Sequence, residues 1–259
     1  MTPADMALLA PDEPPAVIEQ RAAGASPFLL VCDHAGRRIP RRLHDLGLAE
    51  ADRARHIAWD IGIAGVGRHL ADRLDACLVM QPYSRLVIDC NRPPGSATSI
   101  AALSEATRIA GNENLSADDA ARRVREIFTP YHATIAKHLD ARSKSKSKRP
   151  VILISLHSFT PVYTGVARPW HAGVLYNRYD RLAAALLGLL RASGELTFGD
   201  NEPYSVTDDT DYTIPVHGEM RGIPHAAIEI RQDLIGDEPG QRQWANRLAE
   251  LLPQAAAKI

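Results

Sequence analysis

The chain has 259 residues, of which 45% are hydrophobic and 24% are charged, and its formal net charge is −1 at pH 7. This size and composition are typical of one globular domain, and the balanced charge lacks the basic excess that nucleic-acid binding requires. Cys32, Cys77 and Cys90 are odd in number and form no C-x-x-C pair, which argues against a disulfide framework and against a cysteine zinc site.

The N-terminal residues do not resemble a signal peptide. Residues 1–16 contain three acidic residues and four prolines instead of a basic segment followed by an apolar one. The longest aliphatic run, 182–190, lies between Arg181 and Arg191 and is too short to cross a bilayer. We therefore expect a cytoplasmic protein with neither nucleic-acid nor membrane partners.

Strand and helix patterns alternate along the chain. The segments expected to form strands are 28–32, 77–80, 86–89, 151–156, 173–176 and 226–228. The segments expected to be helical are 43–48, 52–74, 116–139 (opened by a capping Ser116), 179–192 and 241–252. This alternation predicts an α/β fold with a mostly parallel or mixed central sheet flanked by helices. One domain is expected over residues 1–259, with 1–25 as an N-terminal extension.

Three of these strands end in side chains that bind metals or transfer protons. The strand at 28–32 is followed by Asp33 and His34, the strand at 151–156 by His157, and the strand at 226–228 by Glu229. Open α/β sheets bind ligands at the carboxyl ends of their strands. A single histidine at such a point is more often a hydrogen-bonded core residue, but the convergence of three strands indicates an active site.

Several enzyme classes are excluded by missing motifs. The chain has no G-x-S-x-G elbow, no Walker A loop and no H-E-x-x-H helix. Two histidines, a carboxylate and a separate glutamate remain. Zinc in hydrolases commonly takes three protein ligands of this kind and leaves its fourth position to water, while a carboxylate accepts the proton.

Five blocks follow one another along most of the chain. They are C-D-H-A-G-x-x-I-P at 32–40, H-I-A-W-D-I-G at 56–62, S-R-L-V-I-D-C-N-R-P-P at 84–94, S-L-H-S at 155–158 and I-E-I-R-Q-D-L at 228–234. Together they resemble the N-formylglutamate amidohydrolase family, which is related to the zinc carboxypeptidases, the succinylglutamate desuccinylases and the aspartoacylases. The resemblance implies a zinc-carboxypeptidase-like (phosphorylase/hydrolase-like) fold.

The resemblance also implies a metal centre with one zinc ion per chain. His34 and His157 match family histidines and are the expected ligands. Related carboxypeptidases have a glutamate three residues after the first histidine, where this chain has Arg37, which cannot bind zinc. Asp60 is the preferred carboxylate ligand and Asp33 is its competitor. Asp60 read simply as a helix-capping or surface acid remains an alternative.

Glu229 matches the general-base segment of the related enzymes. It lies between isoleucines on a buried strand, where desolvation raises a carboxyl pKa and a nearby cation lowers it. The alternative is an ion pair with Arg231, although both side chains alternate with isoleucines and could serve the site together. In the loop from 208 to 222, Tyr212 and His217 are expected to cover the site, with His217 stabilising an oxyanion, unless they are packed loop residues.

Arginines indicate the kind of substrate. A substrate with two carboxylates needs planar, bidentate donors, which arginine provides better than lysine. Arg85, Asn91 and Arg92 flank the 86–89 segment, and the Asn-Arg pair resembles the carboxylate-binding pair of carboxypeptidases. Tyr212 and Arg231 complete the expected substrate-binding set. Simple surface arginines are the alternative reading.

The expected function is therefore zinc-dependent hydrolysis of a small N-acyl amino acid. N-formyl-L-glutamate, cleaved to formate and glutamate, is the substrate that the resemblance implies. His34 is preceded by Asp33 where better-studied members have a proline, so the acyl group or the amino acid could differ here. Two alternatives stay open, a carboxypeptidase acting on peptides and a binding protein that has lost the chemistry.

Overall fold

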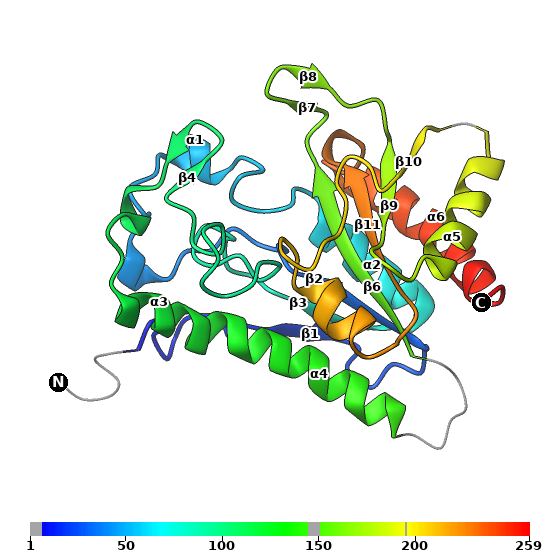
Figure 1. The fold of residues 1–259 in the computed structure, drawn as a ribbon, viewed down its shortest axis with the longest axis horizontal. Coiled ribbons are helices and arrows are strands. Elements are labelled where there is room, and N and C mark those ends of the chain that lie inside the picture. The colour runs from blue at the N-terminus through cyan, green and yellow to red at the C-terminus, as the bar shows by residue number, and fades with distance from the viewer. Residues whose placement is uncertain (1–6, 145–150, 195) are drawn as a thin grey trace.

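A seven-stranded mixed sheet forms the centre of the protein (Figure 1), seen in a computed structural model that describes residues 7–144, 151–194 and 196–259. From one edge to the other its strands are β1 (Ile18–Gln20), β3 (Cys77–Met80), β2 (Phe28–Cys32), β6 (Ile152–Phe159), β11 (His225–Arg231), β9 (Ala172–Leu175) and β10 (Phe198–Asp200). β1 is antiparallel to β3 and β9 is antiparallel to β11, whereas the other neighbours are parallel. The expected α/β fold with a mixed sheet is confirmed.

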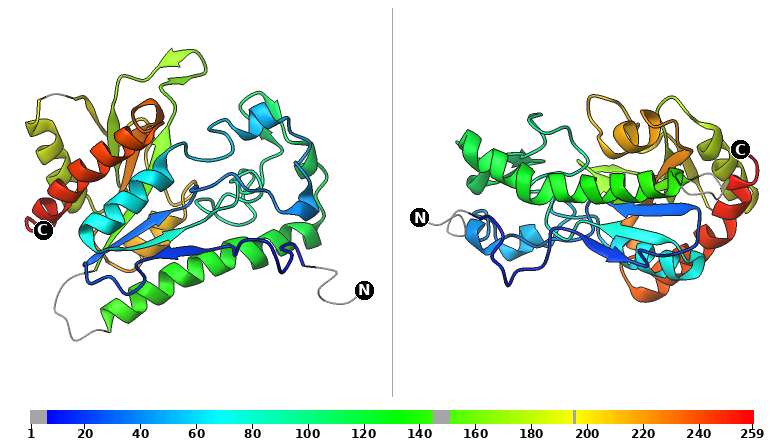
Figure 2. Two further views of the ribbon diagram at one scale, coloured as in Figure 1. Left: turned by 180° about the vertical axis from the view of Figure 1, so that it is seen from behind. Right: turned by 90° about the horizontal axis from the view of Figure 1, so that it is seen from below.

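Helices cover both faces of the sheet (Figure 2). One face packs against α2 (Ile63–Leu74), α5 (Arg181–Ala192) and α6 (Glu238–Ala256). The other packs against α4 (Thr129–Ser143), which continues from α3 (Ala117–Arg123) through a π-helical turn at Val124–Phe128. Because the central strands are buried on both sides, they read as continuous apolar runs, and their alternate side chains enter two separate core clusters.

The remaining regular elements are short and are joined by irregular loops. They are α1 (Glu50–Arg53), the hairpins β4 (Leu103–Ser104) with β5 (Thr107–Arg108) and β7 (Val162–Tyr163) with β8 (Val166–Ala167), the 3₁₀ turns Arg41–Leu43, Ala110–Asn112 and Gln232–Leu234, and a π-helical turn at Ile214–Glu219. β1 lies within the segment expected as an N-terminal extension and adds an edge strand to the sheet. Among the described residues, no helix has both the length and the hydropathy that a membrane crossing requires.

The prediction of a strand at 86–89 is wrong. This segment is a buried loop, and its apolar side chains enter the core beneath α4. No neighbouring strand pairs with this segment in the described structure: Asn112 donates to the carbonyl of Leu86, Arg123 donates to that of Val87, and the N–H groups of Val87 and Asp89 donate to loop carbonyls. An apolar run shows burial, but it does not show which partners take the backbone hydrogen bonds.

The helix expected at 52–74 is interrupted, and the interruption matters for function. α1 ends at Arg53 and α2 begins only at Ile63, after Gly62 adopts a positive φ of 81°. A side chain at that position would collide with the carbonyl of Ile235, so glycine is required there. The turns in between place Asp60 beside β2, where its backbone N–H donates to the carbonyl of His34.

The prediction of a helical segment at 43–48 is wrong, because the 3₁₀ turn ends at Leu43 and non-helical turns follow it, whereas the remaining predicted helices are present with shifted bounds. Ser116 caps α3 as expected, its hydroxyl accepting from the backbone N–H of Asp119 at 3.1 Å. The long helix expected to 139 is divided by the π-helical turn and extends to Ser143. The closing helix α6 is longer than the predicted 241–252 segment: it starts earlier because Asp237 caps it, and it continues to Ala256.

Candidate metal centre and active site

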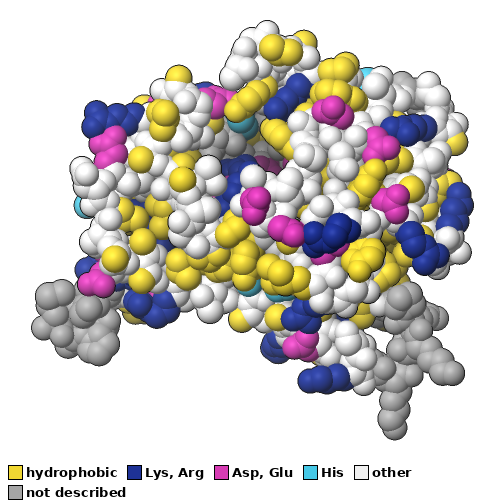
Figure 3. All heavy atoms as spheres, viewed as in Figure 1, with side chains coloured by type: hydrophobic (Ala, Val, Ile, Leu, Met, Phe, Trp, Pro, Cys, Tyr) yellow, Lys and Arg dark blue, Asp and Glu magenta, His cyan; other side chains and the backbone are white. Residues whose placement is uncertain are grey.

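The carboxyl ends of β2 and β6 and the middle of β11 bring the predicted residues together. His34 follows β2, His157 lies near the end of β6, and Glu229 pairs in register with His157 on the adjacent strand. They line a cleft of about 680 Å³. Figure 3 shows its mouth as a hollow near the centre of this face, with basic and acidic side chains inside.

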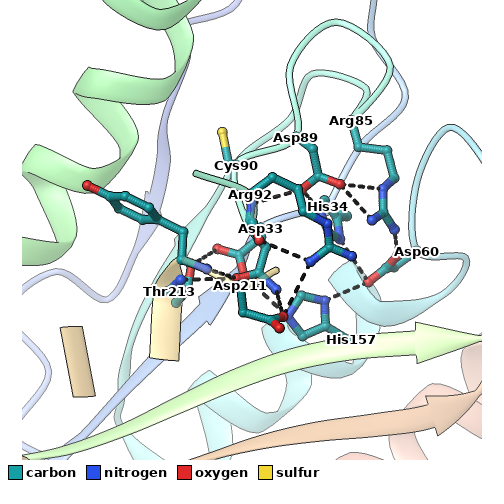
Figure 4. Close-up of polar contacts among 12 residues, drawn as sticks. Asp33, His34, Asp60, Arg85, Asp89, Cys90, Arg92, His157, Asp211 and Thr213 are labelled. Carbon is teal, nitrogen blue, oxygen red and sulfur yellow. Dashed lines mark hydrogen bonds and ion pairs between the residues drawn. The ribbon is translucent and has the colours of Figure 1, made fainter. Parts of the chain in front are cut away.

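Asp60 lies between the two histidines (Figure 4). Its Oδ2 is 2.9 Å from Nδ1 of His157 and 3.4 Å from Nδ1 of His34, and all three residues are buried. One ligand atom from each lies within 4.8 Å of the others. Two imidazole nitrogens and a carboxylate oxygen that converge in this way fit a single divalent cation such as zinc.

Carboxylates also hold the outer nitrogens of both rings. Nε2 of His34 is 2.7 Å from Oδ1 of Asp89, and Nε2 of His157 is 3.2 Å from Oδ2 of Asp33 and 2.9 Å from the Ser155 hydroxyl. Metal-binding histidines are typically oriented by such partners, which leave the other nitrogen free for the metal. Asp33 therefore lies behind His157, while Asp60 faces both rings.

Asp33 is further fixed by hydroxyl groups. Tyr131 and Thr213 donate to its Oδ1 at 2.9 and 2.8 Å, and Ser155 donates to its Oδ2 at 3.3 Å. Burial alone would raise the pKa of Asp33, but His157 and His34 outweigh burial and hold it below its usual value. A carboxylate with these bonds is suited to support His157 and leaves the ligand position to Asp60.

The centre carries an excess of negative charge. Burial would raise the pKa of Asp60 and Asp89, yet the histidines and, for Asp89, Arg85 hold both acids ionised. Burial would likewise lower the pKa of His34 and His157, but the surrounding carboxylates raise it. Groups that draw protons onto buried imidazoles in this way also favour a bound cation.

Glu229 differs from the other acids. It is buried, and its Oε2 has no hydrogen-bond partner among the described residues. Burial raises its pKa to about 7, with His157 opposing the shift and Asp60 adding to it. An unpaired carboxyl group that titrates near neutrality beside the candidate metal ligands has the properties of a general base.

Arg85, Asn91 and Arg92 all line the same cleft. Arg85 donates to Oδ2 of Asp89 through Nε at 3.0 Å and Nη2 at 2.6 Å, and its Nη1 lies 3.5 Å from Asp60. Nη1 of Arg92 is 3.4 Å from Asp211, to which Asn91 also donates at 3.0 Å. The two arginines are therefore held by carboxylates and directed into the cleft.

Three expected site residues lie elsewhere. His217 and the partly buried Tyr212 belong to an aromatic cluster with His132, in which Nε2 of His217 is 3.0 Å from Nδ1 of His132. Burial lowers the pKa of His217 to about 3, so it is neutral. Arg231 pairs with Asp233 and reaches the carbonyl of Trp170. The geometry therefore does not support the expectation that these residues contact the substrate.

Sequence reasoning missed other residues of the cleft. Asp89 follows an apolar run just as Asp33 does, and the same signal therefore marks it as a candidate. Asp211 and Tyr204 come from the long connection between β10 and β11, where no periodicity marks them. Tyr204 also stacks on the guanidinium of Arg168 at 4.8 Å, and Tyr163 of β7 stacks on it at 4.6 Å.

A sequence model of the family described as N-formylglutamate amidohydrolase matches residues 26–236. The chain belongs to this family. The match contains every residue of the proposed centre, from His34 to Glu229.

Two curated proteins that are similar to this chain support its assignment to the family. The chain is 34% identical over 134 residues to an N-formylglutamate deformylase of Pseudomonas aeruginosa, a stretch that covers 48% of each protein. It is 33% identical over 127 residues to an N-formylglutamate deformylase of Pseudomonas putida, covering 45% of this chain and 46% of that protein. The chain thus spans about half the length of the curated relatives it matches.

Solved structures of similar proteins share the fold. The crystal structure of a gene product from Agrobacterium tumefaciens has a TM-score of 0.92 at 36% identity and covers 96% of this chain and 98% of its own. The N-formylglutamate amidohydrolase of Ralstonia eutropha JMP134 has a TM-score of 0.67 at 17% identity, with 94% and 98% covered. The second likeness concerns the fold alone.

Proposed function

We propose that the protein is a zinc-dependent amidohydrolase that cleaves N-formyl-L-glutamate to formate and glutamate. The observation that carries the proposal is the convergence of His34, Asp60 and His157 beside the unpaired carboxyl group of Glu229 in one cleft. Family membership supports hydrolysis of an amide bond.

The donor set suits one zinc ion per chain. Imidazole nitrogen and carboxylate oxygen are common zinc ligands, and three protein ligands leave one position for water or substrate. Asp33 and Asp89 orient the two histidines from behind. A zinc ion held by His34, Asp60 and His157 would polarise the substrate carbonyl and make water a better nucleophile.

Glu229 would move the proton. In its ionised form it accepts a proton from the attacking water, and in its protonated form it donates that proton to the leaving amine nitrogen. A pKa near 7 makes both forms accessible at neutral pH. Asp33, Asp60 and Asp89 are engaged by neighbouring side chains, whereas Oε2 of Glu229 has no hydrogen-bond partner in the described structure. Glu229 is therefore free to exchange a proton with water or substrate.

Arg85, Asn91 and Arg92 would bind the substrate carboxylates. A guanidinium has five N–H donors, so Arg85 and Arg92 can contact a substrate while they remain paired with Asp89 and Asp211. These aspartates fix the direction of each guanidinium before binding. Such preorganisation reduces the entropy lost when a substrate is held.

The decisive experiment measures formate release from N-formyl-L-glutamate together with the zinc content of the purified protein. N-acetyl-L-glutamate and short peptides with a free carboxylate serve as competing substrates. Faster cleavage of the peptides would favour the carboxypeptidase alternative. Stoichiometric zinc and tight ligand binding without hydrolysis of any of them would favour a binding protein.

A further inference from the structure

A second group of metal-binding side chains lies far from the cleft. Glu19 is on the edge strand β1, Cys77 is the first residue of β3, and His138 is on α4. The cleft lies at the carboxyl ends of the central parallel strands, whereas Cys77 lies at the amino end of β3, beside Leu29 of β2. The group is therefore separate from the proposed catalytic centre.

The three side chains meet at one ring nitrogen. Nε2 of His138 is paired with Oε2 of Glu19 and is 3.7 Å from Sγ of Cys77. One ligand atom from each of the three residues lies within 4.8 Å of the others. We propose that Glu19, Cys77 and His138 form a second metal site, selective for zinc or a similar divalent transition-metal ion.

This geometry distinguishes a metal site from a catalytic relay. A nucleophile, base and orienting acid use both nitrogens of the imidazole, one for each partner. Here Glu19 and Cys77 both approach Nε2, so His138 cannot pass a proton from sulfur to the acid through its ring. Three metal-binding atoms grouped this closely can instead share a cation once the hydrogen bond between Glu19 and His138 opens.

The sulfur–nitrogen distance and the ligand types agree with zinc, and Glu19, which is hydrogen-bonded to the same nitrogen, must draw back to admit an ion. Zinc–sulfur and zinc–nitrogen bonds of about 2.3 and 2.0 Å in a tetrahedron separate the two ligand atoms by roughly 3.5 Å, close to the observed 3.7 Å. Thiolate and imidazole select transition metals over calcium or magnesium. Glu19 and a Cys77 thiolate would together neutralise a divalent ion.

Charge and exposure around the group are compatible with binding. Arg142 lies near the thiol, and its Nη1 donates to the carbonyls of Ser26 and Phe28, which fixes its position. Burial raises the pKa of the Cys77 thiol to about 11 against the opposing effect of Arg142, so an ion must displace the thiol proton when it binds. The Glu19 side chain is 36% exposed and that of His138 is 13% exposed, so solvent can supply a fourth ligand.

A metal here would join β1 to β3 and α4. β1 has three residues and pairs with β3 alone, so few backbone bonds hold this edge of the sheet. An ion bound by the folded protein and not by the unfolded chain stabilises the folded state. The expected role is therefore structural, and it is independent of the proposed hydrolysis.

Cobalt substitution tests the site directly. The metal-free protein is titrated with Co²⁺ and its near-ultraviolet absorption is recorded. The catalytic ligands are histidines and a carboxylate, so a thiolate-to-cobalt charge-transfer band can come only from a cysteine site. We expect this band to grow with a second equivalent of Co²⁺, and the thermal unfolding midpoint to rise with it.

Variants assign the band. Cys77→Ser should abolish it. Glu19→Gln and His138→Gln should weaken Co²⁺ binding at least about tenfold. Because both side chains are partly exposed, these two variants test the site without altering the buried core. His69→Gln is the matched control, because His69 forms a surface pair with Glu238, 4.0 Å apart, without a cysteine. It should leave the band unchanged.

Two results would overturn the second site. One is the absence of a charge-transfer band at saturating Co²⁺, and the other is a band that persists in Cys77→Ser. A protein that binds one equivalent of metal without this band and still hydrolyses its substrate would refute the second site alone.

Discussion

Nε2 of His34 lies 2.7 Å from Oδ1 of Asp89, and the other oxygen of this carboxylate accepts two bonds from Arg85. The backbone N–H of Asn91 also donates to Oδ1 at 2.9 Å. Asp89 thus connects His34, the first proposed metal ligand, to the arginine expected to bind substrate. It turns the His34 ring so that Nδ1 faces Asp60.

Asp89→Asn should therefore weaken metal binding without removing a ligand. Loss of such a supporting partner typically costs about 10–100-fold in metal affinity or activity. Competition with a zinc chelator, followed by metal analysis, measures the effect. An unchanged affinity would show that the ring of His34 is held by its packing and not by Asp89.

Asp60→Asn and Asp33→Asn should differ from each other. Asp60 faces Nδ1 of both histidines, so Asp60→Asn should lower zinc affinity at least about tenfold. Asp33 lies on the far side of His157 and only supports its ring, so Asp33→Asn should weaken zinc binding less than Asp60→Asn does and should still leave a bound metal. Zinc content after dialysis checks both variants, and the reverse order would transfer the ligand role to Asp33.

Glu229→Gln should separate chemistry from binding. Glutamine keeps the size of the side chain but cannot accept the proton, so zinc and substrate should still bind. The expected loss is about 10²–10⁴-fold in rate, seen in kcat more than in KM. Turnover close to that of the native protein would refute Glu229 as the base, whatever the zinc content.

The pH dependence of kcat/KM should reflect the ionisation of Glu229. Burial raises the pKa of Glu229 to about 7, and only its ionised form accepts a proton, so kcat/KM should rise with pH and level off above this pKa. A bound cation lowers a carboxyl pKa, which places the acid limb at or below about pH 7. The same limb persisting in the residual activity of Glu229→Gln would assign it to another group.

Arg92→Lys should raise KM for a dicarboxylate substrate. Lysine keeps the charge but loses the planar fork that contacts a carboxylate through two donors. Zinc content should not change, because Arg92 contacts Asp211 and not the metal ligands. Steady-state kinetics of both proteins check this, and an unchanged KM would place the substrate carboxylates elsewhere in the cleft.

Arg231→Lys tests the placement of the third expected arginine. Arg231 pairs with Asp233 outside the cleft, so its substitution should leave KM near the native value. A rise in KM as large as that of Arg92→Lys would show that Arg231 reaches the substrate.

Local pattern was sufficient for the strands that form the site. The strands 28–32 and 77–80 have the predicted bounds, and β6 and β11 were found within a few residues, because strands buried on both faces leave uninterrupted apolar runs. The same rule failed for 86–89. That run is equally buried, but Asn112 and Arg123 supply its backbone partners from distant segments.

Two pairs of residues show what sequence by itself determined and what only the tertiary structure decided. His34 and His157 could be selected from sequence because each lies at the end of an apolar strand, and parallel strands deliver their ends to one edge. The sequence could not rank Asp60 and Asp33 as candidate metal ligands, because the ranking depends on which side of His157 each carboxylate approaches. The positive φ of Gly62 and the hydrogen bond from the Asp60 N–H to the His34 carbonyl set this direction.

Tyr212 and His217 likewise carry suitable chemistry, but packing against His132 directs them away from the cleft. Side-chain direction is a property of the folded neighbours, which the local pattern does not contain.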